Sequence, residues 1–247
     1  MGIESLGLSR ALAVGPWAQR SQQGWHEGLL AGCPVVLAHC GVGVRAAQRC
    51  TEALLRAYEP RLVLLTGAAG GVAPQVDLGD LVLAEAVYQL DSRRLALFHR
   101  NPRAHASHGR ADFCEKLVAA RYPCDPGYLA LAWRAAEVAP LRPVRSRPPK
   151  VLEAGVATAG GVVRNRRCGE QMAREHGILA TDMEGAAVAH VCAMHGIPFL
   201  SIRSISDLIG RHWQWLTMIR YLVPAQRNAE RLVFSLVQLL SQDAFVG

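Results

Sequence analysis

The sequence predicts a single α/β domain with a largely parallel sheet, and three observations carry this prediction. The chain has 247 residues, of which 51% are hydrophobic, enough for one sizeable core. Short apolar runs typical of buried strands alternate with longer helical stretches. Two of these runs lead directly into glycine-rich segments, as strands do where an open α/β sheet binds a ligand.

The first half of the chain alternates helical and apolar stretches. A short helix is expected at Ser5–Val14, because Gly15-Pro16 would end it. The two glycine segments carry no bulky side chain, so a ligand could approach their backbone, although tight packing explains them as well. The other expected elements are the strand Pro34–Ala38, the helix Arg45–Tyr58 after Gly41-Val42-Gly43, the strand Arg61–Thr66 before the turn Gly67–Gly71, and the strand Asp80–Val87.

The second half continues in the same way. Helices are expected at Ala111–Arg121 and Tyr128–Val138, and the proline- and glycine-containing segment Tyr122–Gly127 separates them. Val151–Thr158 reads as a further strand. The amphipathic stretch Pro224–Leu240 predicts a final helix.

Two carboxylates stand in different settings within Leu179–Gly210. Glu184 opens a helix of small residues that is expected at Gly185–His195. The apolar run Ile197–Ile205 then reads as a buried parallel strand, and Asp207 follows its carboxyl end. Ligands lie outside the carboxyl ends of such strands, so both carboxylates can face one crevice. Taken singly, Asp207 could instead cap a turn, and Glu184 could be favoured by the helix dipole alone.

This stretch resembles the nucleoside phosphorylase and nucleosidase superfamily. In that family the helix opens with a Met-Glu pair, here Met183-Glu184, and the following strand ends in Ser-Asp, here Ser206-Asp207. The resemblance covers most of residues 24–90 and 151–241. It implies a three-layer α/β/α fold with a mixed, largely parallel sheet, a homodimer or larger homo-oligomer, and neither a metal nor a cofactor.

The resemblance also implies cleavage of the N-glycosidic bond of a purine nucleoside. In this reaction the leaving base takes up a proton, the ribosyl ring becomes cationic, and a nucleophile attacks the opposite face. Asp207 would supply the proton, because an apolar wall raises the pKa of a carboxyl group by desolvation. Glu184 would accept hydrogen bonds from the ribose hydroxyls. The other expected substrate-binding residues are Met183, Ala68, Gly70, Val162 and Ser206.

The chain departs from the resembled family at the nucleophile. The family begins with an apolar strand before a glutamate that activates water; here Glu4 comes almost at once, so we expect the single domain of residues 1–247 to lack that strand. Glu4 is the candidate base, or else a charged residue of a frayed terminus. Resembled phosphorylases bind phosphate through an arginine and a hydroxyl where this chain has Leu65 and Ala68. Water is therefore expected, with Arg45 the only nearby cation.

The substrate stays open at this level. Resembled nucleosidases stack a phenylalanine on the purine where this chain has Val162. Three nucleoside groups remain: methylthioadenosine and adenosylhomocysteine; futalosine-type nucleosides, favoured by the run DMEGAA at Asp182–Ala187; and adenosyl-hopanoids, favoured if Trp213 and Trp215 form an apolar wall and do not simply cover the core. A phosphorolytic enzyme and a non-catalytic nucleoside-binding protein of the same fold are further alternatives.

Composition sets the remaining expectations. Much of the net charge of +7 lies in Arg142–Lys150, but without interleaved aromatic residues a solvated basic loop is favoured over a nucleic-acid site. No apolar run is long enough for a membrane span, and no signal peptide is evident. Seven cysteines without a C-x-x-C pair indicate reduced thiols and a cytoplasmic protein. The spacing of His190, Cys192 and His195 favours packing over metal binding.

Overall fold

The structure is a computed structural model of the chain. It describes residues 19–20, 25–95, 117–209 and 214–243. Glu4, the helix expected at Ser5–Val14 and Trp213 lie outside these ranges, and the side chain of Trp215 is not described either.

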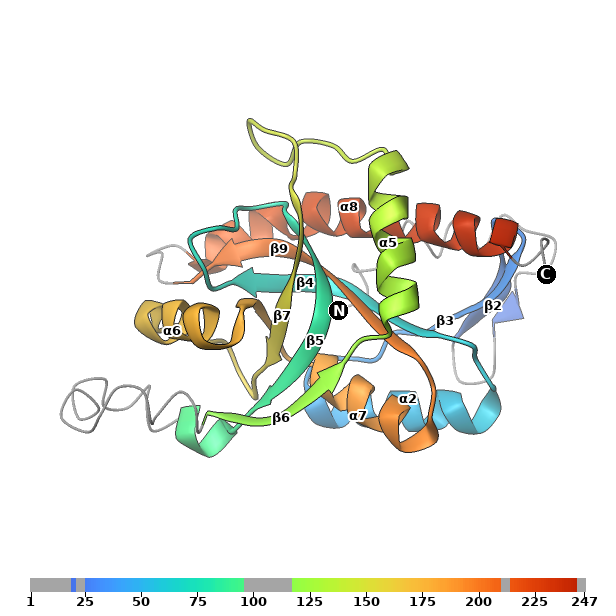
Figure 1. Cartoon of the computed structure of the whole chain (residues 1–247), viewed down its shortest axis with the longest axis horizontal. Coiled ribbons are helices and arrows are strands. Elements are labelled where there is room, and N and C mark those ends of the chain that lie inside the picture. Colours follow the sequence, from blue (N-terminus) through green and yellow to red (C-terminus); the bar gives the residue numbers. More distant parts are fainter. Residues whose placement is uncertain (1–18, 21–24, 96–116, 210–213, 244–247) are drawn as a thin grey trace.

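A mixed, twisted sheet forms the centre of the molecule (Figure 1). Its strands are β4 (Val63–Gly71), β5 (Leu81–Leu90), β6 (Val118–Pro123), β7 (Val151–Thr158), β8 (Ile178–Asp182) and β9 (Phe199–Leu208). They lie in the order β6-β5-β7-β8-β4-β9. The last strand, β9, also pairs with β5, so the sheet curls back on itself. The pairs β4–β9, β5–β7 and β7–β8 are parallel. The pairs β4–β8, β5–β6 and β5–β9 are antiparallel.

A small antiparallel sheet precedes this centre. It contains β1 (Gln19–Arg20), β2 (His26–Leu30) and β3 (Cys33–Leu37). Helix α8 contacts β2 and β3 as well as β4 and β9, so it connects the two sheets along one side of the molecule.

Helices cover both sides of the central sheet (Figure 1). They are α2 (Val44–Ala57), α5 (Pro126–Val138), α6 (Arg166–His176), α7 (Gly185–His195) and α8 (Gln214–Asp243). Helix α5 packs on α8, α2 packs on α7, and α6 packs on β8. The predicted three-layer α/β architecture is confirmed, and apolar side chains of β5, β9 and α8 fill its core, among them Leu83, Ile202 and Leu236.

Local signals set several helix ends. The Asp125 side chain accepts hydrogen bonds from the backbone N–H groups of Gly127 and Tyr128, which caps α5. Gly196 ends α7 in the left-handed conformation that glycine adopts without strain. As a result α7 occupies the predicted range Gly185–His195, and β7 likewise occupies the predicted range Val151–Thr158.

Two predicted elements are wrong, and two others have different bounds. Gly67–Gly71 is not a turn but the second half of β4, because its neighbours β8 and β9 pair with it. Residues 118–121 belong to strand β6 and not to a helix, because they complete an edge pairing with β5. Helix α8 does not begin at Pro224 but runs through it from Gln214. Strand β9 extends to Leu208, so Asp207 lies in its last residues and not beyond them.

None of the described helices is both long and apolar enough to cross a membrane. Six cysteines lie in the described ranges, and all six are free thiols.

Candidate active site

Glu184 links two segments that are far apart in the sequence. It is the N-cap residue of α7, at the end of the short connection from β8. Its Oε1 accepts a 2.7 Å hydrogen bond from the backbone N–H of Gly43, which precedes α2, and its Oε2 accepts a 3.3 Å bond from the N–H of Met183. Burial raises the pKa of the Glu184 carboxyl, while the Gly43 N–H and the charge of Arg203 oppose this rise.

Asp207 lies at the carboxyl end of β9 and is 7% exposed. Its Oδ1 accepts a hydrogen bond of 3.0 Å from the Ser206 hydroxyl, which also lies 3.4 Å from the carbonyl oxygen of Ala69. A side chain at Gly70 would place its Cβ 3.3 Å from Asp207 Oδ2. The glycine of β4 therefore leaves the Asp207 carboxylate room on that side.

Arg203 is a site residue that the sequence analysis missed. It lies in β9 opposite Gly67 of β4 and is 3% exposed. A Cβ at Gly67 would lie 2.5 Å from Arg203 Nη1, so the glycine makes room for the guanidinium. A signal was present, since an arginine within an apolar strand requires a buried partner. Which residue that partner is could not be deduced from the sequence.

The partner is Asp182, the last residue of β8. Its Oδ2 lies 2.6 Å from Arg203 Nη2, and its Oδ1 accepts a 2.6 Å hydrogen bond from the Thr158 hydroxyl. The backbone N–H groups of Glu184 and Gly185 also bond to this carboxylate at 3.1–3.3 Å. Asp182 therefore holds Arg203 and the first turn of α7 in one buried network.

Thr158 completes this network from the end of β7. Its hydroxyl oxygen accepts a 2.7 Å hydrogen bond from the backbone N–H of Ala186, and its hydroxyl group donates a hydrogen bond to Asp182. A Cβ at Gly185 would lie 2.6 Å from Asp182 Oδ2, which explains a glycine at the first position of α7. The run DMEGAA thus has a structural reason besides its resemblance to a family.

Most of the predicted site residues lie on the neighbouring strands β4 and β9 or at the start of α7, which follows β8. Ala68 and Gly70 of β4 pair with Ser204 and Asp207 of β9, and β8 pairs with β4 next to Gly70. Val162 lies in the connection from β7 to α6 and is 52% exposed. Arg45, in the first turn of α2, is exposed.

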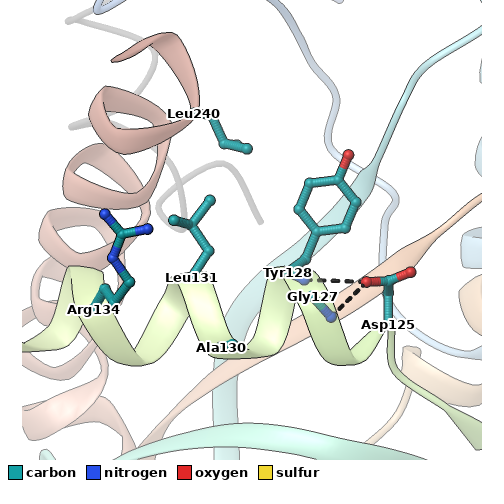
Figure 2. A pocket seen from close by; sticks show the side chains of 7 residues that line it. All are labelled: Asp125, Gly127, Tyr128, Ala130, Leu131, Arg134 and Leu240. Atoms are coloured by element: carbon teal, nitrogen blue, oxygen red, sulfur yellow. Dashed lines mark hydrogen bonds between the residues drawn. The ribbon is translucent and has the colours of Figure 1, made fainter. Parts of the chain in front are cut away.

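A hollow of about 390 Å³ lies elsewhere, between the N-terminal part of α5 and the C-terminal part of α8 (Figure 2). Its lining residues include Tyr128, Leu131 and Leu240, and none of its lining residues is a predicted site residue. Its carboxylate, Asp125, already caps α5. We therefore do not place the reaction there.

The described residues contain no group of three or more His, Cys, Asp or Glu side chains that could hold a metal ion. The His190 ring packs edge-on against Tyr122, with 3.2 Å between its Nδ1 and the tyrosine oxygen. Burial raises the pKa of the Cys192 thiol to about 12. The ring contact of His190 and the full burial of Cys192 support a packing role for these two side chains.

The mixed, largely parallel sheet covered by helices is of the nucleoside phosphorylase-like α/β type. A family model described as "Phosphorylase superfamily" matches residues 6–237. The chain therefore belongs to the phosphorylase superfamily, and the recognition made from Met183-Glu184 and Ser206-Asp207 is confirmed.

Several curated relatives carry the same name. A 5′-methylthioadenosine/S-adenosylhomocysteine nucleosidase of Mycobacterium bovis is 31% identical over 182 residues, which are 71% of this chain and 70% of the relative. The protein of the same name from Chromohalobacter salexigens is 28% identical over 225 residues, which are 90% of this chain and 87% of that relative.

Solved structures share the fold. The nucleosidase of this name from Colwellia psychrerythraea, in complex with adenine, has a TM-score of 0.76 at 26% identity and matches 97% of this chain and 92% of its own. The futalosine hydrolase of Helicobacter pylori has a TM-score of 0.75 at 21% identity, covering 97% of this chain and 94% of its own.

Proposed function

We propose that the chain is a nucleosidase that hydrolyses the N-glycosidic bond of a purine nucleoside of the methylthioadenosine and adenosylhomocysteine type or of the futalosine type. The predicted enzyme class is the one that the curated relatives carry in their names. The structural neighbour crystallised with adenine supports a purine as the leaving base. A nucleoside is thus the proposed small-molecule partner, while a homodimer and a cytoplasmic location stay predictions.

The observation that supports the proposal is that the strands leading to Glu184 and Asp207, β8 and β9, both pair with β4 at Gly70. Asp207, nearly buried at the end of β9, is assigned to proton delivery to the leaving base. Glu184, held in place by the Gly43 N–H, is assigned to the ribose hydroxyls. Hydrogen bonds to these hydroxyls strengthen as the ring becomes cationic, so they lower the barrier as well as hold the sugar.

The remaining assignments follow from the same arrangement. Met183 and Ser206 flank the two carboxylates in sequence, and Ala68 and Gly70 lie on the neighbouring strand. Val162, being exposed, is free to contact a base that enters from solvent. Glu4 is the proposed base that activates water, and it lies outside the described residues.

Water is the proposed nucleophile. Leu65 and Ala68 provide neither the cation nor the hydroxyl that would hold phosphate on β4. Arg203 is the specific observation in favour of phosphorolysis, since it is a fixed cation close enough to lower the pKa of Glu184. Its ion pair with Asp182 already neutralises it, so a phosphate dianion would gain little there.

A product assay tests the proposal. The purified chain would be incubated with methylthioadenosine, adenosylhomocysteine, futalosine and adenosine, each with and without phosphate. We expect release of free base together with the free sugar, at a rate that phosphate does not raise. A sugar 1-phosphate product would contradict the hydrolytic assignment. If none of the nucleosides releases its base, a non-catalytic binding protein would be favoured.

A further inference from the structure

Arg203 retains unused hydrogen-bonding capacity despite its burial. Among the described residues, neither its Nε nor its Nη2 has a hydrogen-bond partner. The 2.6 Å approach of Nη2 to Asp182 Oδ2 is therefore an ion pair whose N–H direction is poorly aligned with the carboxylate oxygen. A guanidinium in this state is able to bind an anion once its charge is no longer compensated.

Three ionisable side chains act on Arg203 or share its surroundings. The first is Asp182, which forms an ion pair with Arg203. The second is Glu184, whose pKa is lowered by the charge of Arg203 and raised by that of Asp182. The third is Cys40, whose thiol pKa is raised to about 11 by burial and next by Glu184, so that this thiol carries no charge at neutral pH. With both carboxylates ionised, Asp182, Glu184 and Arg203 carry one net negative charge. The ion pair of Asp182 with Arg203 is neutral, so the excess charge lies on Glu184.

We propose that Asp182 is a specificity-determining positioning residue, which neutralises Arg203 and thereby excludes phosphate from the site in favour of water. This inference rests on the proposed hydrolytic function. Asp182 does not touch the substrate; it acts through Arg203. It is also fixed in place, because the Thr158 hydroxyl and the N–H groups that open α7 hold its two oxygens. A carboxylate held in this way cannot rotate away to release the guanidinium.

Asp182→Asn makes the consequence measurable. Asparagine keeps the shape and can still accept the Thr158 hydrogen bond, but the site then loses a negative charge beside Arg203. Binding of a dianion should improve at least tenfold, or about 1.4 kcal/mol. Sulfate is the first probe because it binds without turnover, and inorganic phosphate is the second. Both are titrated by calorimetry and by competition with adenine.

A double-variant cycle separates the pair from a general change in charge. Arg203→Gln alone should leave sulfate affinity unchanged, because the paired guanidinium does not contribute to anion binding. The double variant Asp182→Asn with Arg203→Gln should lose the tenfold gain. Unchanged sulfate affinity in a folded Asp182→Asn protein, or a gain that survives in the double variant, would overturn the inference.

Thr158 provides a second route if Asp182→Asn does not fold. Thr158→Val removes the hydroxyl that holds Asp182 Oδ1, and Thr158→Ser is the matched control that keeps it. The valine variant should bind sulfate more tightly than the serine variant, and equal affinities would overturn the inference. The wild-type chain should bind sulfate weakly. A dissociation constant below about 1 mM would mean that Arg203 already binds anions, and it would overturn the inference.

These measurements are independent of turnover. Sulfate binding is recorded without a nucleoside, so the inference can fail while the wild-type chain still hydrolyses its substrate. Conversely, if the wild-type chain releases no base from any nucleoside, the proposed function fails, whatever the variants bind. A role of Asp182 in stability alone would lower the unfolding midpoint without changing the affinity for sulfate.

Discussion

Asp207→Asn is the substitution that tests the assigned chemistry most directly. Asparagine preserves the shape of a side chain that is 7% exposed, and its carbonyl oxygen can still accept the Ser206 hydroxyl hydrogen. It has no carboxylic proton to deliver. Removal of a general acid costs about 10²–10⁴-fold in rate, or roughly 2.7–5.5 kcal/mol of barrier.

The assay is release of adenine from methylthioadenosine, followed by the change in ultraviolet absorbance. We expect kcat to fall by about a hundredfold or more, while KM changes little and the unfolding midpoint stays near that of the wild type. Ser206→Ala is the matched control: it removes the hydroxyl hydrogen bond to Asp207 Oδ1 and leaves the acid, so its loss should stay below about tenfold. A rate for Asp207→Asn within tenfold of the wild type would refute the assignment.

Three further predictions concern Glu184 and Gly67. Glu184→Gln should weaken binding of a nucleoside far more than binding of free adenine, since each charge-assisted hydrogen bond to ribose is worth about 1.5–3 kcal/mol; equal losses in a calorimetric titration would contradict the ribose role. Because burial raises the pKa of Glu184 above 4.5, the folded state binds this proton more tightly than the unfolded state, so stability falls as pH rises from about 4.5 through the raised pKa. Denaturant unfolding across that pH range should show a smaller fall in Glu184→Gln than in the wild type, and identical profiles would argue against a desolvated carboxylate. Gly67→Ala should destabilise the chain by about 1–3 kcal/mol, since its Cβ would lie 2.5 Å from Arg203 Nη1 and displace the buried guanidinium; Gly161→Ala, whose Cβ meets nothing within 4 Å, is the control without a clash.

Local sequence signals were sufficient for many elements of the fold. Helix α7 follows from its run of small residues and from Gly196, which ends it. Strand β7 follows from a mainly apolar run, VLEAGVAT. The two carboxylates could also be found in the sequence, because Glu184 and Asp207 stand at the ends of these local patterns.

The sequence was misleading wherever a segment depends on a distant partner. Gly67–Gly71 has the composition of a turn, yet it is a strand because β8 and β9 pair with it from opposite sides. Residues 118–121 form a strand because the edge of β5 is available to them. Such pairings involve residues many positions apart, and no local propensity contains them.

The sequence by itself therefore determined the class of the domain and most of its local elements, and it supplied the two carboxylates as candidates for the site. Only the tertiary structure decided their surroundings: the Gly43 N–H on Glu184, and the buried pair of Asp182 and Arg203. The physical reason is that a buried charge must be compensated, but its partner is selected by the packing of strands that the sequence does not place side by side.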